Sequence, residues 1–156
     1  MTWRVPFLRR AFVGASVAWS LALPLASLAS SEPRASSGVY LFSFFVYLTG
    51  RLLCHQLPER SFFLWGSQMP VCARCSGIYF GAAVAAIILS ARRSGPALHR
   101  ARIALLVAVV PTAATLVYEW TTGRTPSNWI RATAGVPIGA VVAWIVCRLR
   151  PEPVEG

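Results

Sequence analysis

The sequence predicts an all-α membrane protein, built as a small bundle of about five transmembrane helices. Of its 156 residues, 56% are hydrophobic and 13% are charged, whereas a soluble domain has about 25% charged residues. Five stretches of 16 residues or more carry no charged residue, at positions 11–31, 35–50, 75–91, 103–118 and 132–147. A spanning helix needs about 20 apolar residues, so the shorter stretches span only with their flanking Arg, Trp and Tyr residues.

Residues 1–36 form an N-terminal transmembrane or signal-like segment followed by a linker. Arg4, Arg9 and Arg10 precede a long apolar run, and the small residues at 26–30 are similar to a signal cleavage site. The apolar run is longer than that of a usual signal peptide, which favours an uncleaved first helix. A Ser-rich stretch with Pro33 then ends this region.

Residues 37–150 form the helical membrane domain, with four core helices and a Cys/His loop at 51–77, and residues 151–156 form a polar tail. The pairs Gly77/Gly81 and Gly135/Gly139 are GxxxG motifs, which allow close contact between helices. They predict a compact bundle. The uncharged, aromatic segment at 61–73 is typical of an interfacial or re-entrant segment that covers a site.

The formal net charge is +10, and this charge indicates a lipid surface rather than nucleic acid. The arginines lie at the edges of apolar runs, where they can reach lipid phosphates. The chain has no basic run interleaved with aromatic residues, as a nucleic-acid-binding surface would. The expected partner is the lipid bilayer.

Three cysteines and one histidine lie in the polar loop, and their chemistry predicts a metal site. Cys54 and His55 precede a CxxC pair, Cys72 and Cys75, by 17 to 18 positions. Three thiolates and an imidazole complete a tetrahedral zinc site, and iron is the second choice of metal. Adjacent ligands such as Cys54 and His55 require that the helix before them ends, which Pro58 favours.

The same cysteines are also consistent with redox chemistry. The CxxC pair opens an apolar helix, whose free N–H groups favour thiolate over thiol. A membrane thiol-disulfide or quinone-linked oxidoreductase using Cys72 and Cys75 is therefore an alternative to zinc. Cys147 stands alone in the last apolar stretch and is expected to be a core residue.

Glu119 is an acidic residue next to an apolar stretch, where an ionisable group is costly unless it is paired. Its expected partners are Arg74, Arg124 and Arg131. An anion carrier or channel lined by these arginines is a third function, and it would need a homo-oligomer to build a path. The polar groups expected around the metal or a substrate are Gln56, Arg60, Arg74, Glu119, Ser127, Asn128 and Arg131.

Several short motifs surround the cysteines, and a second block of motif residues lies further along the chain. They are Cys54-His55-Gln56, Pro58-Glu59-Arg60-Ser61-Phe62, Pro70-Val71-Cys72-Ala73-Arg74-Cys75 and Gly77-Ile78-Tyr79, then Glu119, Ser127-Asn128, Arg131, Gly135 and Gly139. In these motifs the chain resembles the predicted membrane proteins of domain-of-unknown-function family 2085, over roughly residues 38–148. Ser76 and Ala134 replace an expected Thr, and Glu119-Trp120 replaces Asp-Gly.

The resemblance implies a small helical membrane bundle in the cell membrane of a bacterium or archaeon, with several passes through the bilayer. It implies no particular activity or substrate. The chemistry of the site residues therefore has to identify the function.

Overall fold

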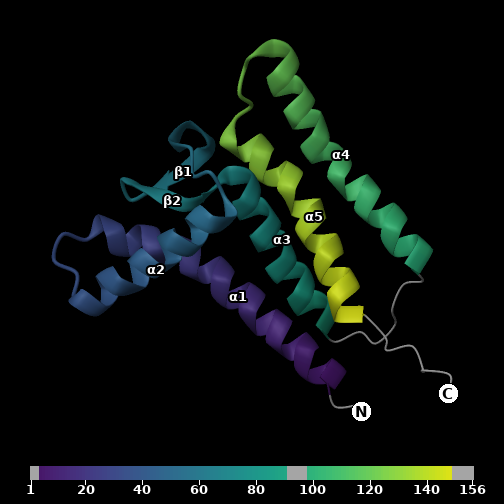
Figure 1. The fold of residues 1–156 in the computed structure, drawn as a ribbon, viewed down its shortest axis with the longest axis horizontal. Coiled ribbons are helices and arrows are strands. Elements are labelled where there is room, and N and C mark those ends of the chain that lie inside the picture. Colours follow the sequence, from purple (N-terminus) through teal and green to yellow (C-terminus); the bar gives the residue numbers. More distant parts are fainter. Residues whose placement is uncertain (1–3, 91–97, 149–156) are drawn as a thin grey trace.

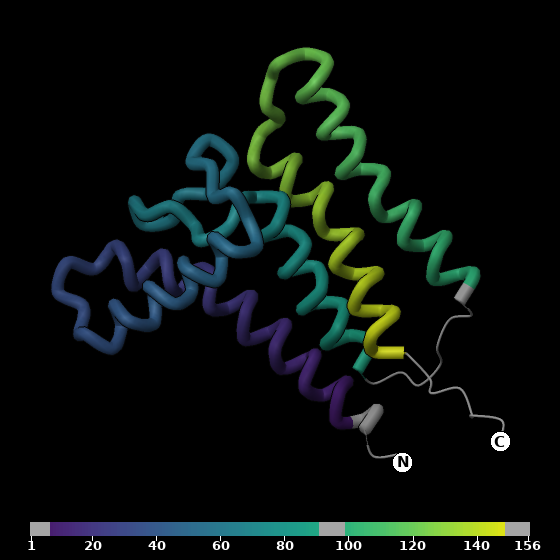
Figure 2. Tube along the Cα trace, viewed as in Figure 1, coloured from purple at the N-terminus to yellow at the C-terminus, as the bar shows by residue number. Residues whose placement is uncertain are grey.

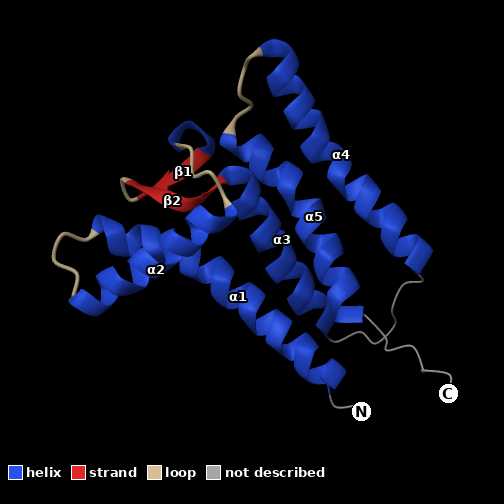
Figure 3. Cartoon of the chain, in the orientation of Figure 1, coloured by secondary structure: helices blue, strands red, loops and turns tan. Residues whose placement is uncertain are grey.

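The computed structural model describes residues 4–90 and 98–148, which form five helices and one small hairpin (Figure 1, Figure 3). The elements in chain order are α1 Arg4–Ser31, α2 Ser37–Leu53, the 3-10 turn η1 Pro58–Arg60, β1 Ser61–Leu64, β2 Ser67–Cys72, α3 Ala73–Ser90, α4 Leu98–Thr122 and α5 Asn128–Arg148. The all-α architecture is thus confirmed. The expected polar tail at 151–156 lies outside the described residues, as do residues 1–3 and 91–97.

Four of the five helices are long and apolar enough to cross a membrane. Their apolar parts are Phe7–Ser31 in α1, Ala73–Ser90 in α3, His99–Thr122 in α4 and Asn128–Arg148 in α5. Helix α2 is apolar but has only 17 residues, near the lower limit for a span. It folds back beside the C-terminal half of α1 and ends next to the hairpin (Figure 2).

Helices α3 and α5 run side by side in the same direction, and their glycines allow this close approach (Figure 1). A Cβ atom added to Gly77 would lie 1.9 Å from the carbonyl oxygen of Ala132. A Cβ atom added to Gly139 would lie 1.9 Å from the carbonyl oxygen of Ile78. The two GxxxG motifs therefore face each other within one chain, which confirms the expected compact bundle.

The segment expected to be interfacial or re-entrant is an antiparallel hairpin of β1 and β2. Its strands are joined at Trp65 and Gly66, which have φ angles of 52° and 79°. Two consecutive positive φ angles match the twist of a two-residue hairpin turn. Glycine adopts such an angle easily, but tryptophan rarely does, so the sequence indicates this turn only weakly.

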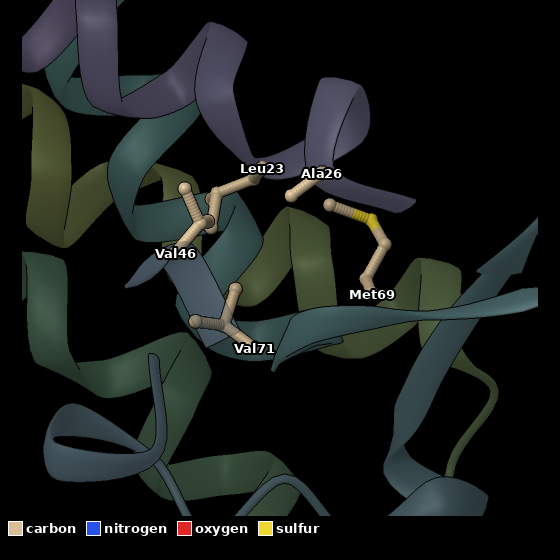
Figure 4. Packing of buried hydrophobic residues seen from close by; sticks show 5 residues of the cluster. All are labelled: Leu23, Ala26, Val46, Met69 and Val71. Carbon is tan, nitrogen blue, oxygen red and sulfur yellow. The ribbon is translucent and has the colours of Figure 1, made fainter. Parts of the chain in front are cut away.

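The hairpin is held against α1 and α2 by a cluster of buried side chains (Figure 4). Leu23 and Ala26 of α1 and Val46 of α2 contact Met69 and Val71 of β2. Figure 4 shows the Met69 side chain extending toward Ala26. This packing fixes the end of β2, where Cys72 precedes the first residue of α3.

Candidate metal centre and ion-pair cluster

Three cysteines from different elements meet at the start of α3. Cys54 follows the last residue of α2, Cys72 ends β2, and Cys75 lies in the first turn of α3. Their sulfur atoms all lie within 4.8 Å of one another. The chain leaves Cys54, passes through the paired strands β1 and β2, and returns at Cys72. The hairpin therefore brings Cys54 and Cys72 together.

The arrangement of the sulfur atoms fits a zinc-sized ion. With Zn–S bonds of about 2.3 Å, two sulfurs on a tetrahedron lie about 3.8 Å apart. Separations of up to 4.8 Å reach this value with small side-chain rotations. All three thiols are free and half-buried.

Cys72 has the surroundings of a thiolate. Hydrogen bonding from the Cys75 thiol lowers the pKa of Cys72, and the backbone N–H groups of Cys75 and Arg74 and the Cys54 thiol lower it further, against the opposing effect of burial. The backbone N–H of Cys72 in turn donates to the Cys54 sulfur at 3.3 Å. The start of α3 thus supplies the donors that stabilise negative charge on sulfur.

His55 lies outside the group of three sulfurs. Helix α2 ends at Leu53, as the sequence predicted, but Cys54 then adopts an extended conformation with φ −150° and ψ 145°. Side chains of successive residues in extended backbone point to opposite sides. The His55 side chain is therefore exposed while Cys54 faces the cluster.

Gln56 braces the loop that carries the cysteines. Its Nε2 donates to the carbonyl oxygen of Tyr47 at 3.0 Å and to that of Pro70 at 2.6 Å. Gln68 Nε2 donates to the carbonyl oxygen of Gln56 at 2.7 Å, and Tyr47 donates its hydroxyl hydrogen to the carbonyl oxygen of Gln68. Gln56 thus links the end of α2 to β2, two residues before Cys72.

A second cluster, the ion-pair cluster of Arg60, Arg74, Glu119 and Arg131, lies at the same end of the bundle. Glu119 Oε1 accepts hydrogen bonds from Arg131 Nε at 3.0 Å and from Arg74 Nη2 at 3.2 Å. Arg60 Nη1 lies 3.5 Å from Glu119 Oε2. The Arg131 and Glu119 side chains are 2% and 6% exposed, so this charge is enclosed by protein.

The other expected polar residues surround the ion-pair cluster. Asn128 Nδ2 donates to the carbonyl oxygen of Ser61 at 2.8 Å, which ties α5 to the hairpin. Ser127 is exposed, and its hydroxyl accepts from the N–H of Ile130 at the start of α5. Arg124 is exposed and has no carboxylate within ion-pair distance among the described residues.

Residues 54–145 match the family of predicted membrane proteins called domain-of-unknown-function family 2085. The chain belongs to this family. The match begins at Cys54, so it includes all three clustered cysteines and the whole ion-pair cluster, while α1 and α2 precede it. The resemblance seen in the sequence motifs is therefore confirmed, and the family's region is the part that builds both clusters.

Two archaeal relatives are similar to this member of the family. An uncharacterized protein of Methanocaldococcus jannaschii is 56% identical over 43 residues, which is 28% of either chain. An uncharacterized protein of Methanothermobacter thermautotrophicus is 32% identical over 96 residues, 60% of this chain and 83% of the relative. No solved structure is significantly similar to the chain.

Thr115 is a polar residue of the candidate site that the sequence motifs did not single out. Its hydroxyl accepts a hydrogen bond from Arg74 Nη2 at 3.0 Å, and the residue is buried. Thr115 precedes Glu119 by four positions on α4, so both side chains lie on one helix face. The spacing of four residues between Thr115 and Glu119 is the sequence feature that could have identified Thr115.

Proposed function

We propose that this family member is a multi-pass protein of a prokaryotic cell membrane that binds zinc through Cys54, Cys72 and Cys75. The convergence of three sulfurs from three elements within 4.8 Å carries the proposal. Thiolate sulfurs are ligands that zinc prefers, and hydrogen bonding from its neighbours lowers the pKa of Cys72, which favours its thiolate. Iron is the other metal that suits a sulfur-rich site.

The bound metal would connect α2, β2 and α3. When four protein ligands close the shell, zinc acts as a structural link, whereas an open fourth position allows Lewis-acid chemistry. His55 is the proposed fourth ligand. Because its side chain is now exposed on the opposite side from Cys54, its binding requires the backbone at these two residues to rotate.

The first test is the metal content of protein purified in detergent, with reduced thiols and without a metal-affinity step. We expect about one zinc per chain in the wild type and almost none in Cys72→Ser. Cys147→Ser is the matched control, because Cys147 is buried between Ala86 and Ala143 and away from the cluster. Metal-free wild type, or equal metal in Cys72→Ser, would overturn the proposal.

The role of His55 is tested by chelator competition on the zinc-loaded protein. If His55 binds the metal, His55→Ala weakens zinc affinity by tenfold or more. If the three sulfurs bind alone, His55→Ala leaves the affinity unchanged, and the fourth position belongs to water or a substrate.

Thiol oxidation is the second candidate function, and the lowered pKa of Cys72 favours it. In that reaction Cys72 and Cys75 lose two protons and two electrons and form a disulfide, while a quinone accepts both and becomes a hydroquinone. Maleimide labelling after quinone addition measures the loss of two free thiols. If quinone protects two thiols from maleimide in metal-free protein, and this protection disappears in Cys75→Ser, thiol oxidation is favoured over zinc binding.

A further inference from the structure

The ion-pair cluster contains more positive than negative charge. Arg74 and Arg131 share the single carboxylate of Glu119 at distances of 3.0 to 3.2 Å. Arg60 adds a third guanidinium at the rim, where its side chain is 39% exposed and exposed Glu59 lies 4.0 Å from its Nε. Even when Glu59 is counted, one positive charge stays without a partner. Such a charge is costly in an enclosed site unless an anion accompanies it.

Unused hydrogen-bond donors identify where that anion would bind. Arg131 is 2% exposed, yet its Nη1 has no acceptor among the described residues. Arg74 Nε is also buried without an acceptor there. Buried guanidinium nitrogens usually have partners, so two arginines with free donors indicate a missing acceptor.

The surrounding backbone adds to the positive potential. Helices α3 and α5 run in the same direction (Figure 1), and Arg74 and Arg131 lie in their first turns. Each helix start carries a positive partial charge and free N–H groups. The C-terminal turn of α4, which carries Glu119, opposes them with one negative partial charge. The combined positive partial charge of the two helix starts is larger than this negative partial charge.

One side of the cluster reaches the surface, and a hollow lies next to another. Arg60 reaches the surface at the hairpin. A hollow between the end of α4 and the start of α5 is lined by Thr115 and Ser127, and Thr115 contacts Arg74. None of the cluster's charged residues lines this hollow, so the half-exposed Arg60 is the point at which a small anion meets the cluster.

We propose that Arg60, Arg74 and Arg131 form a binding site for a phosphate group. Guanidinium groups bind phosphate oxygens through two parallel N–H bonds, which suits phosphate better than a spherical anion such as chloride. The group belongs either to a free phosphate or to the headgroup of an anionic lipid, because the site lies at the ends of the spanning helices, where headgroups lie. This site does not depend on the metal centre.

The first experiment adds inorganic phosphate to the full-length protein in a neutral detergent and measures binding by calorimetry, with chloride as the comparison anion. We expect saturable binding of one phosphate per chain. The affinity should fall tenfold or more in Arg131→Gln, because a central guanidinium is lost. Arg124→Gln removes the same charge from an exposed position outside the cluster and should bind like wild type.

Arg131→Gln removes a buried charge and puts folding at risk, so half-exposed Arg60 supplies the second variant. Arg60→Gln should keep the zinc content of the wild type and lower phosphate affinity by three- to tenfold. Arg60→Lys keeps the charge but loses the planar fork, so only part of the affinity should return.

A second arm distinguishes the two sources of phosphate. Protein is reconstituted in vesicles containing phosphatidylglycerol and is then extracted, and the retained lipid is measured by mass spectrometry. About one anionic lipid per chain, fewer in Arg60→Gln and unchanged in Arg124→Gln, identifies the headgroup. Binding of inorganic phosphate alone identifies the free anion. Absence of both kinds of binding, or wild-type affinity in both Arg60→Gln and Arg131→Gln, overturns the proposal.

Discussion

Arg131 and Glu119 form an ion pair inside the bundle, with Arg131 Nε 3.0 Å from Glu119 Oε1. The pair joins the first turn of α5 to the last turn of α4. Glu119 also faces Arg74 of α3 and Arg60 of η1, so one carboxylate links four parts of the fold.

Removal of Glu119 should therefore cost more than removal of any one arginine. Glu119→Gln leaves Arg74 and Arg131 without a carboxylate and Arg60 with only the exposed Glu59, and we expect the free energy of unfolding to fall by about 3–5 kcal/mol. Arg131→Gln should cost less, because Glu119 keeps Arg74 and Arg60. Denaturant unfolding in detergent measures both. The control is Glu59→Gln, which removes an exposed carboxylate. Equal losses in all three variants would contradict this account.

The contact between α3 and α5 should tolerate no added methyl group. In Gly139→Ala the new Cβ would lie 1.9 Å from the Ile78 carbonyl oxygen, so the helices must separate. We expect a loss of about 3 kcal/mol or more, at the upper end of the usual cost of overpacking. Gly14→Ala on α1 is the matched control, because no heavy atom lies within 4 Å of the added Cβ. It should raise stability by up to about 1 kcal/mol. Thermal unfolding of the two variants checks the difference.

Gln56 should act on the metal site through the hairpin. Gln56→Ala removes both Nε2 hydrogen bonds and leaves the carbonyl oxygens of Tyr47 and Pro70 without this donor. We expect a loss of about 1–3 kcal/mol and weaker zinc binding, because the end of β2 is less firmly held. Thr49→Ala is the control, since the Thr49 hydroxyl bonds only within its own helix, to the Phe45 carbonyl oxygen. Unchanged zinc affinity in Gln56→Ala would show that the brace does not support the site.

Cys72 should react as a thiolate at a lower pH than an ordinary cysteine. Its pKa is lowered, chiefly by hydrogen bonding from Cys75. An ordinary cysteine thiol has a pKa of about 8.5. In metal-free protein the rate of iodoacetamide labelling of Cys72 should reach half its maximum at a pH well below that value. Peptide mass spectrometry measures this rate. In Cys75→Ala the midpoint should move to higher pH, and a midpoint unchanged from wild type would disprove the assigned cause.

The same shift predicts how stability depends on pH. A group whose pKa is lower in the folded state stabilises the protein fully above its unfolded pKa of about 8.5. This contribution is lost as the pH falls toward the folded pKa of Cys72. Metal-free protein should therefore unfold more easily as the pH is lowered below 8.5, and Cys72→Ala should show a weaker dependence.

The sequence by itself determined the membrane class, the number of helices and the segment in which the three clustered cysteines lie. Apolar stretches free of charge report helices directly, because a bilayer tolerates few unpaired charges. The GxxxG motifs correctly indicated a close helix contact. Local chemistry also marked Cys54, Cys72 and Cys75, and Pro58 indicated that the helix before them ends.

Only the tertiary structure decided which polar residues meet. The hairpin depends on a left-handed turn at Trp65, a residue that does not mark such turns, and it is this hairpin that returns Cys72 to Cys54. Extended backbone at Cys54 directs His55 away from the sulfurs, although the two residues are adjacent. Arg60 takes the place beside Glu119 that Arg124 was also expected to fill. These contacts join residues that are far apart in the chain. They depend on how the helices pack and not on any local sequence pattern.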